Sequence, residues 1–373
     1  MIDSQQPPVT RGFLFTDRMR SALQEYAARG MDRFHARDML SAMAAWEMQT
    51  SPEARSSYMD IWERSGVTVA CGTYSEAGLP SQAFESAVRR IAEAQAFVNA
   101  LEGDLLLVHK ASDIEEAHRE GKRGIILDFQ NATAIGDDLD RIDSFHNLGV
   151  RMIQLTYNLR NLVGDGCTET YKSGLTYFGR EVVQHLNQRG ILVDVSHCSE
   201  QVGWDTLDVS SAPIVISHAS SAAIYEHDRA KSDDLAKAVA TRGGYFGVVL
   251  IPGFIQESPV ATLDDLAHHV EHLVDVMGID HVGIGTDKSG PGPSTESLIE
   301  FPESMPFLHD DSFNWIGFRP EHRLQGDYRF QGYDDFRDWP NISVHLAQRG
   351  FTEEELRKLL GLNFLRVYRE VVG

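Results

Sequence analysis

The sequence is poor in cysteine, with only Cys71, Cys167 and Cys198 among 373 residues. Three cysteines this far apart cannot build a disulfide framework. No apolar run approaches the roughly 20 residues that a membrane-spanning helix needs. The opening MIDSQQPPVT also lacks the charged and apolar segments of a secretory signal. We therefore expect a reduced, cytoplasmic protein with no membrane partner.

Positive charge is also scarce. Thirty-four Lys and Arg residues face 55 Asp and Glu residues, giving a formal net charge of −21. Nucleic acids and anionic lipids repel so acidic a chain, which excludes them as partners. The chain contains neither a Walker-type loop nor a GxGxxG loop for phosphate groups. We expect a small-molecule substrate, and the sequence leaves a homo-oligomer open.

Seven short runs of Val, Ile and Leu do not alternate with polar residues, as is typical of buried parallel strands. They lie at 67–72, 124–129, 151–156, 191–196, 214–217, 245–251 and 282–286. Amphipathic segments lie between most of them, at 137–149, 178–190, 232–244 and 262–278 among others. With a short first strand at the initial MID, eight βα units predict an α/β protein with a (β/α)8 TIM barrel; a doubly wound open sheet is the alternative.

We expect one domain that spans 1–373, and the remaining segments are insertions and loops of that domain. Residues 11–57 have helical composition and predict a helical insertion after the first strand. The apolar run at 104–111 is expected outside the barrel. Residues 288–342 are rich in Gly, Pro and aromatic residues and predict a long loop region after the last strand. That loop region would lie on the face where barrel enzymes build their sites.

Histidines follow two neighbouring predicted strands, in ILVDVSHCSE and PIVISHASSA. Since the carboxyl ends of barrel strands meet at one rim, we expect His197 and His218 to share a pocket. Two neutral imidazoles are typical of a zinc-type site. Asp287 ends the last strand, where a buried carboxylate needs a cation or donors. It is a metal ligand, a general base or a cap of the next loop, and we expect it in the same pocket.

Other polar residues lie at the same predicted rim. Gln130 and Asn131 follow the strand GIILDF; their amide groups suit weak metal ligation, a substrate contact or loop anchoring. Arg229 follows the strand that carries His218. Its guanidinium suits a substrate carboxylate, or else a salt bridge with a nearby acid.

These motifs resemble those of the renal (membrane) dipeptidase family of the amidohydrolase superfamily. The resemblance is carried by LVDVSHCS, IVISHASSAAIYEHDRAKSDD and HVGIGTDKSG, and extends over about 58–290 and 340–373. It implies a (β/α)8 barrel with two zinc ions and a bridging hydroxide that attacks the peptide bond of a dipeptide. His197 and His218 match two ligands of one metal. Asp287 matches a ligand of the other metal and the proton acceptor, and Arg229 matches an arginine beside the substrate.

The chain departs from that family at four positions. Where the family's first strand has a His-x-Asp metal pair, this chain has Gln5 and Pro7; the bridging glutamate is Gln130, and the histidine after the fourth strand is Tyr157. One metal position thus lacks three of its four side-chain ligands, counting the bridge. Because two dications need carboxylates to offset their repulsion, we expect at most one zinc or other divalent ion per chain.

The resemblance and the departures leave three hypotheses. The first is a metal-dependent hydrolase of a small dipeptide-like or related carboxylate-bearing substrate, contacted by Arg229, Gln130, Tyr157 and Asn131. The second is a metal-free barrel with a binding role. The third is a metal-free isomerase or lyase that uses the two histidines and Asp287 as acid–base groups. A barrel alone does not decide among them, since barrels host many chemistries.

Overall fold

The computed structural model describes residues 1–7, 9–10, 16–75, 80–288, 318 and 329–373. Within them, eight parallel strands follow one another around a ring. In ring order these are β1 (Ile2–Gln6), β2 (Val69–Thr73), β4 (Arg123–Phe129), β5 (Val150–Gln154), β6 (Leu192–Asp194), β7 (Val215–Ser221), β9 (Tyr245–Val248) and β11 (Val282–Ile284).

Hydrogen bonds between the first and last strands close this ring. The Ser4 hydroxyl of β1 donates to the Ile284 carbonyl of β11 at 2.9 Å. Just beyond the strands, the Asp287 amide donates to the Gln5 carbonyl at 2.9 Å. The fold is therefore the predicted (β/α)8 barrel, and its closure brings the first strand beside Asp287.

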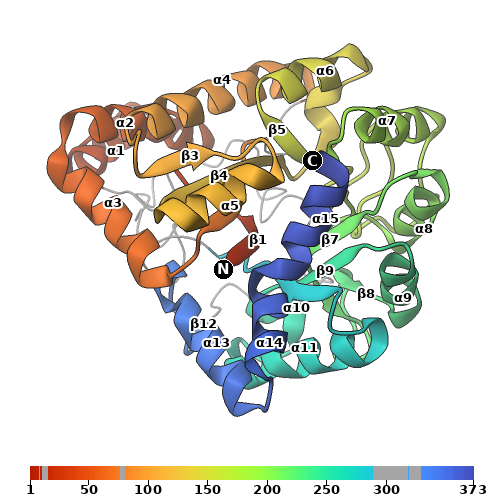
Figure 1. Cartoon of the computed structure of the whole chain (residues 1–373). Helices are drawn as coiled ribbons and strands as arrows, with labels where there is room; N and C mark the ends of the chain where they lie inside the picture. The colour runs from red at the N-terminus through yellow and green to blue at the C-terminus, as the bar shows by residue number, and fades with distance from the viewer. Residues whose placement is uncertain (8, 11–15, 76–79, 289–317, 319–328) are drawn as a thin grey trace.

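Helices surround the ring of strands (Figure 1). They are α1 (Asp17–Ala28), α2 (Arg33–Thr50), α3 (Pro52–Ser65), α4 (Pro80–Asn99), α5 (Ala111–Glu120), α6 (Asp140–Asn147), α7 (Tyr177–Gln188), α8 (Glu200–Val209), α9 (Asp233–Thr241), α10 (Pro252–Ile255), α11 (Leu263–Met277), α13 (Trp339–Gln348), α14 (Glu353–Arg357) and α15 (Asn363–Val372), with short 3₁₀ or π turns η2 (Ala132–Ile135), η5 (Phe336–Asp338) and η6 (Lys358–Leu362). The N-caps of α9 and α11, Ser232 and Thr262, accept from the amides of Leu235 and Asp265. Such caps satisfy amides that the first helical turn leaves unpaired.

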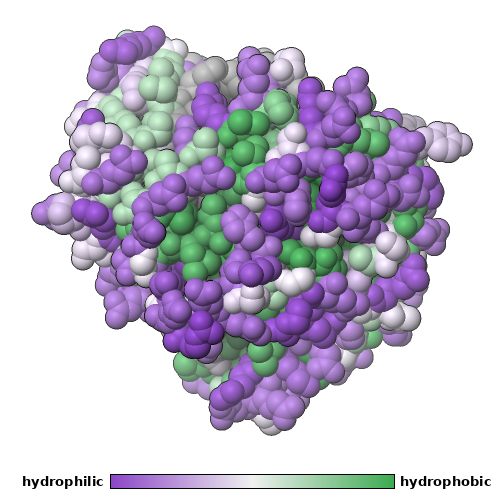
Figure 2. Space-filling model, turned by 45° about the horizontal axis from the view of Figure 1, so that its top comes forward, coloured by the Kyte–Doolittle hydropathy of each residue, from purple (hydrophilic) through white to green (hydrophobic). Residues whose placement is uncertain are grey.

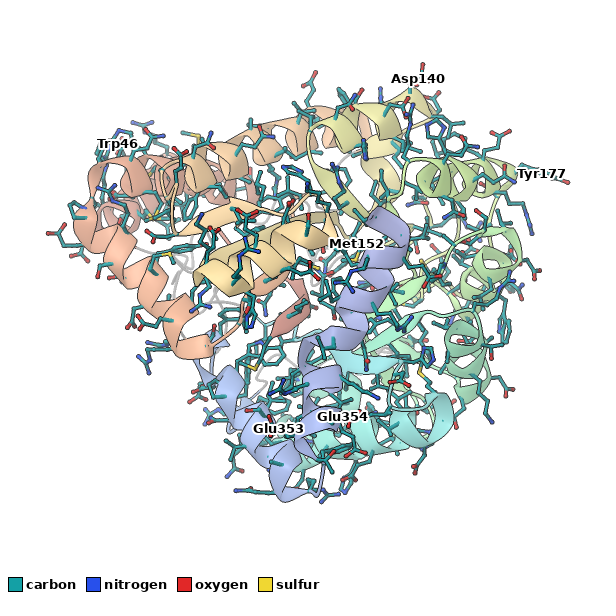
Figure 3. All side chains as sticks on the ribbon, viewed as in Figure 1. Trp46, Asp140, Met152, Tyr177, Glu353 and Glu354 are labelled. Carbon is teal, nitrogen blue, oxygen red and sulfur yellow. The ribbon has the colours of Figure 1, made fainter. Side chains whose placement is uncertain are left out.

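The end of the barrel opposite the candidate site is filled by α15. Its Phe364, Val367 and Tyr368 belong to the same buried cluster as Met152 and other side chains of the strands. Figure 1 shows α15 crossing the ring, and Figure 3 places Met152 toward its centre, whereas Trp46, Asp140 and Tyr177 lie at the periphery. Apolar side chains therefore close this end of the barrel. A polar site can lie only at the other end, where the strands have their carboxyl ends.

The segments outside the barrel differ from the predictions in their bounds. The helical insertion predicted at 11–57 consists mostly of helix where it is described, but α3 continues to Ser65, and residues 11–15 lie outside the described residues. The run at 104–111 contains β3 (Leu105–Leu107), which pairs with β4 outside the ring, as predicted. A further short strand, β8 (Ala230–Lys231), pairs with β7.

The predicted loop region 288–342 is only partly described, since 289–317 and 319–328 lie outside the described residues. Its last part is not a loop. It forms β12 (Arg329–Gln331), which pairs with β10 (Val260–Thr262), and it contains the start of α13. The prediction was wrong here because the aromatic residues are buried core: Phe330, Tyr333, Phe336 and Trp339 are each at most 2 % exposed.

The surface is mostly hydrophilic on the face that Figure 2 draws, and hydrophobic residues show between the hydrophilic ones. None of the helices in the described ranges combines the length and the apolar composition needed to cross a bilayer.

A buried histidine of α11 predicts a pH-dependent stability. His269 Nδ1 accepts from the Ser221 amide, and Nε2 donates to the Ile255 carbonyl. Burial lowers the pKa of His269 from 6.5 to about 4. Between these values the unfolded chain binds the proton that the folded chain excludes, so stability is present above pH 6.5 and is lost as the pH falls toward 4.

We expect His269→Gln to remove this contribution. The wild-type free energy of unfolding should drop between pH 7 and pH 5 by about 2 kcal/mol more than that of the variant. Urea unfolding of both proteins at the two pH values measures the difference. An equal drop in both would show that His269 is not the titrating group.

Candidate metal centre

Three side chains from separate strands converge at the carboxyl ends of the barrel strands. The ligand atoms of His197, His218 and Asp287 all lie within 4.8 Å of one another. The two Nε2 atoms are 2.9 Å apart, and an Asp287 carboxylate oxygen lies 3.9 Å from His218 Nε2. The structure therefore brings these three residues together, as we expected from their places after strands of one barrel.

The backbone places each of the three differently. His197 follows the last residue of β6 by three positions. His218 lies inside β7 rather than at its end, because β7 continues beyond an irregular register to Ser221 and pairs there with β8. Asp287 follows β11 with φ at 51°, the one non-glycine residue with a positive φ in the described chain. Such a conformation costs energy and is concentrated at functional sites.

Each imidazole has a hydrogen-bond partner on the side away from the cluster. His197 Nδ1 lies 2.7 Å from Asn158 Oδ1. His218 Nδ1 lies 2.8 Å from the hydroxyl of Ser217, which in turn lies 2.6 Å from Asp194 Oδ2. All five residues are at most 1 % exposed. The Nε2 atoms of both rings are thus left to face the cluster.

Burial and a nearby cation favour neutral histidines in the cluster. Burial lowers the pKa of both His197 and His218 well below the ordinary value, and the nearby Arg229 cation lowers both further. Burial raises the pKa of Asp287 to about 7, although Arg229 and a hydrogen bond from Gln130 oppose this. Neutral imidazoles are the form that binds a metal.

Gln130 and Tyr157 border the cluster. Gln130 Nε2 lies 3.5 Å from both His218 Nε2 and Asp287 Oδ1. The Tyr157 ring stacks on that of His197, with centroids 4.1 Å apart. Both residues are partly exposed, so both are placed to meet a ligand.

Asn131 lies beside the cluster without facing it. Its Oδ1 accepts from the amide and hydroxyl of Thr133 and from the side chain of Asn161. These bonds favour the loop-anchoring role over the predicted substrate contact.

Arg229 lies in the turn before β8, but its side chain is fully buried. Its two terminal nitrogens donate to the carbonyls of Ser196 and His218, at 2.5 and 2.8 Å. The side chain therefore ties β7 to the turn that carries His197. The alternative of a salt bridge finds no support, since no ion pair within 4.0 Å involves Arg229 in the described chain. Its Nε–H has no hydrogen-bond partner among those residues.

The cluster offers three protein ligands to a metal ion. Two imidazoles and one carboxylate are the usual three protein ligands of a catalytic zinc, which keeps a fourth position open. A second ion would need donors from Gln5, Pro7 and Gln130. Gln5 Nε2 instead donates to the Gln6 carbonyl, proline has no donor atom, and Gln130 turns its amide nitrogen toward Asp287. No carboxylate comes from these positions to offset a second dication.

Sequence reasoning missed the residues that support the two rings. Asp194 carries the same signal as Asp287, a carboxylate in an apolar strand, and that signal could have found it. Ser217 and Asn158 carry no such signal, because serine and asparagine are ordinary beside a strand end.

Comparisons with known proteins identify the family of the chain. A model of the membrane dipeptidase family, peptidase family M19, matches residues 23–306. Dipeptidase tcpJ of Claviceps purpurea is 30% identical over 268 residues, covering 71% of this chain and 55% of that protein. The uncharacterized dipeptidase C965.12 of Schizosaccharomyces pombe is 28% identical over 307 residues, 80% of this chain and 65% of that protein. The chain thus spans less than two thirds of the length of these two curated relatives.

Solved structures show the same barrel. An amidohydrolase from Pseudomonas aeruginosa matches with a TM-score of 0.72 at 30% identity, covering 84% of this chain and 92% of that one. A metallopeptidase from Rhodobacter sphaeroides, liganded with a phosphinate mimic of L-Ala-D-Ala, matches with a TM-score of 0.70 at 20% identity, covering 88% and 96%. The second likeness concerns the fold alone. Because the family model matches most of its length, the chain belongs to the membrane dipeptidase family, peptidase family M19.

Proposed function

We propose that this chain is a metal-dependent hydrolase of a small dipeptide-like amide and that it uses a single divalent ion, zinc or a similar metal. The observation that carries the proposal is the cluster of His197, His218 and Asp287, with ligand atoms within 4.8 Å, at the catalytic end of a barrel of this family. Two neutral nitrogens and one carboxylate oxygen suit zinc.

In this proposal the protein supplies binding, orientation and a proton acceptor. When bound, the ion would polarise a water molecule and the scissile carbonyl. His197 and His218 hold the ion, and Tyr157 packs on the outer face of the His197 ring. Asp287 faces the imidazole pair and is placed to accept a proton from the attacking water and return it to the leaving amine.

Arg229 supports a substrate that carries a carboxylate. A buried guanidinium is costly without an anion, and no ion-pair partner lies within 4.0 Å of it in the described ranges. Two of its five donors bind main-chain carbonyls, and the Nε–H remains for a ligand. Gln130 offers a second polar contact at the edge of the cluster.

We expect Arg229→Lys to raise KM for a dipeptide at least tenfold, because lysine has no counterpart of the Nε–H that is left for the carboxylate. Lysine can still reach one of the two carbonyls, so kcat should fall less than KM rises. Steady-state kinetics on L-Ala-D-Ala and on its C-terminal amide measure this. The amide, which has no carboxylate, should show the same KM with both proteins. Unchanged kinetics on L-Ala-D-Ala would leave Arg229 with only its structural bonds.

The proposal as a whole is tested on chelator-treated protein reloaded with zinc or manganese. We expect one equivalent of metal per chain by elemental mass spectrometry, and hydrolysis of dipeptides that depends on it. Two equivalents would contradict the single-ion assignment. A chain that binds neither metal and cleaves no dipeptide would overturn the proposal in favour of a metal-free acid–base or binding role.

A further inference from the structure

We propose that Asn158 and the Asp194–Ser217 pair are positioning residues that fix both imidazoles as Nδ1–H tautomers, so that two Nε2 lone pairs face each other before any metal arrives. This inference rests on the proposed role of His197 and His218 as metal ligands. It assigns a task to three buried residues that touch neither the metal position nor a substrate.

For His197, Asn158 Oδ1 is the group that fixes the tautomer. The oxygen lies 2.7 Å from His197 Nδ1, and the Cys167 thiol also approaches it, at 3.4 Å. An amide oxygen has no proton to donate, so Asn158 Oδ1 accepts from both groups. His197 Nδ1 must therefore carry the proton, which leaves Nε2 with a lone pair.

For His218, Ser217 and Asp194 together fix the tautomer. The Ser217 hydroxyl has one proton, and its oxygen lies 2.6 Å from Asp194 Oδ2 and 2.8 Å from His218 Nδ1. An ionised carboxylate only accepts, so the hydroxyl proton goes to Asp194 and the oxygen accepts from Nδ1–H. Burial raises the pKa of Asp194, and the bonds that its other oxygen accepts from the amide and hydroxyl of Ser196 and from the Ser217 amide oppose this rise.

The two assignments together exclude a hydrogen bond between the histidines. The Nε2 atoms are only 2.9 Å apart, the length of a good hydrogen bond. A proton between them would require an Nε2–H tautomer, whose Nδ1 would then face an acceptor oxygen at 2.7 or 2.8 Å. With both protons held on Nδ1, the lone pairs repel each other, and a cation bound by both removes the repulsion. Buried partners that fix a tautomer in this way are a common support of metal-bound histidines.

Nitrogen NMR tests the tautomers directly and without any metal. The chelator-treated full chain, labelled with ¹⁵N-histidine, is examined at pH 8 by long-range ¹H–¹⁵N correlation, which distinguishes protonated from bare ring nitrogens. Among the 15 histidines, His197 and His218 are identified by the signals missing from His197→Gln and His218→Gln. We expect Nδ1–H and bare Nε2 in both rings. An Nε2–H signal from either ring overturns the proposal.

Zinc affinity tests whether the positioning matters. By competition with a chelator, Asn158→Leu and Ser217→Ala should each bind zinc 10- to 100-fold more weakly. Asn158→Asp and Ser217→Thr, which keep an acceptor oxygen, should restore most of the affinity. Asn363→Leu is the matched control, since Asn363 is a buried asparagine that bonds the carbonyls of Ile279 and Val282 away from the site. It should change the melting temperature but leave zinc affinity within twofold.

The outcomes separate this inference from the proposed function. If Asn158→Leu and Ser217→Ala lower only the melting temperature, as the control does, the residues are structural and the positioning role is wrong. Zinc binding by a protein with an Nε2–H ring refutes the inference and leaves the metal site standing. A protein with both expected tautomers that binds no zinc confirms the tautomers and refutes the proposed metal centre.

Discussion

Asp287→Asn should keep the fold and lose most of the activity. Asparagine tolerates the positive φ of 51° that this position requires. The backbone N–H of residue 287 still donates to the Gln5 carbonyl. The substitution removes the carboxylate that lies beside the two imidazoles in the cluster. We expect kcat/KM for L-Ala-D-Ala, at saturating zinc, to fall by about 10²- to 10⁴-fold, the usual effect of removing a general base. Zinc affinity should fall as well, because two of three protein ligands remain.

Asp287→Ala serves as the comparison. It removes the same carboxylate but also places a Cβ-bearing residue with no local hydrogen bond in the left-handed region, which costs roughly 1–2 kcal/mol. The alanine variant should therefore match the asparagine variant in activity and unfold at a lower temperature. An asparagine variant with near wild-type kinetics would mean that Asp287 only caps the following loop.

The strands and the convergence of the site could be predicted from the sequence because both follow from general rules. Continuous runs such as IILDF and LVDV are typical of strands covered on both faces. Parallel strands in a barrel end at one rim, so histidines after neighbouring strands must meet. The positions of His197, His218 and Asp287 needed no knowledge of side-chain packing.

The direction of side chains could not be predicted in the same way. Arg229 follows a strand and looks like a surface residue, yet its guanidinium turns inward to the Ser196 and His218 carbonyls. The sequence predicts where the backbone of a residue lies in the fold. The burial of a long side chain depends on hydrogen-bond acceptors that distant elements supply. The aromatic residues at 330–339 were misread for the same reason, because their partners lie in other parts of the chain.

A second metal site should form when the donors missing from this chain are introduced. The variant Gln5→His, Pro7→Asp and Gln130→Glu supplies the donors that the resemblance to the family implies. The structure places two of these positions at the cluster. The Gln5 carbonyl accepts from the Asp287 amide, and Gln130 Nε2 lies 3.5 Å from Asp287 Oδ1. Asp287 would then gain a neighbouring imidazole and two carboxylates, a donor set with the charge that a second dication needs.

We expect the triple variant to bind two equivalents of zinc per chain, against one for the wild type, by elemental mass spectrometry after dialysis. Without metal, the two new carboxylates beside Asp287 repel each other, so the melting temperature should fall below that of the wild type. Zinc should then raise the melting temperature of the triple variant more than that of the wild type, because a ligand that binds only the folded state stabilises it.

Two partial variants decide which replacements matter. Gln130→Glu alone supplies the bridging charge without the first-strand donors, and Gln5→His with Pro7→Asp supplies those donors without the bridge. Each should still bind one equivalent, because each leaves the second ion with an incomplete ligand set. If the triple variant also binds only one, the lost ligands are not what limits the metal count. In that case the first strand, where Gln6 and Thr286 hydrogen-bond the Asp3 carboxylate, does not present residues 5 and 7 to the pocket.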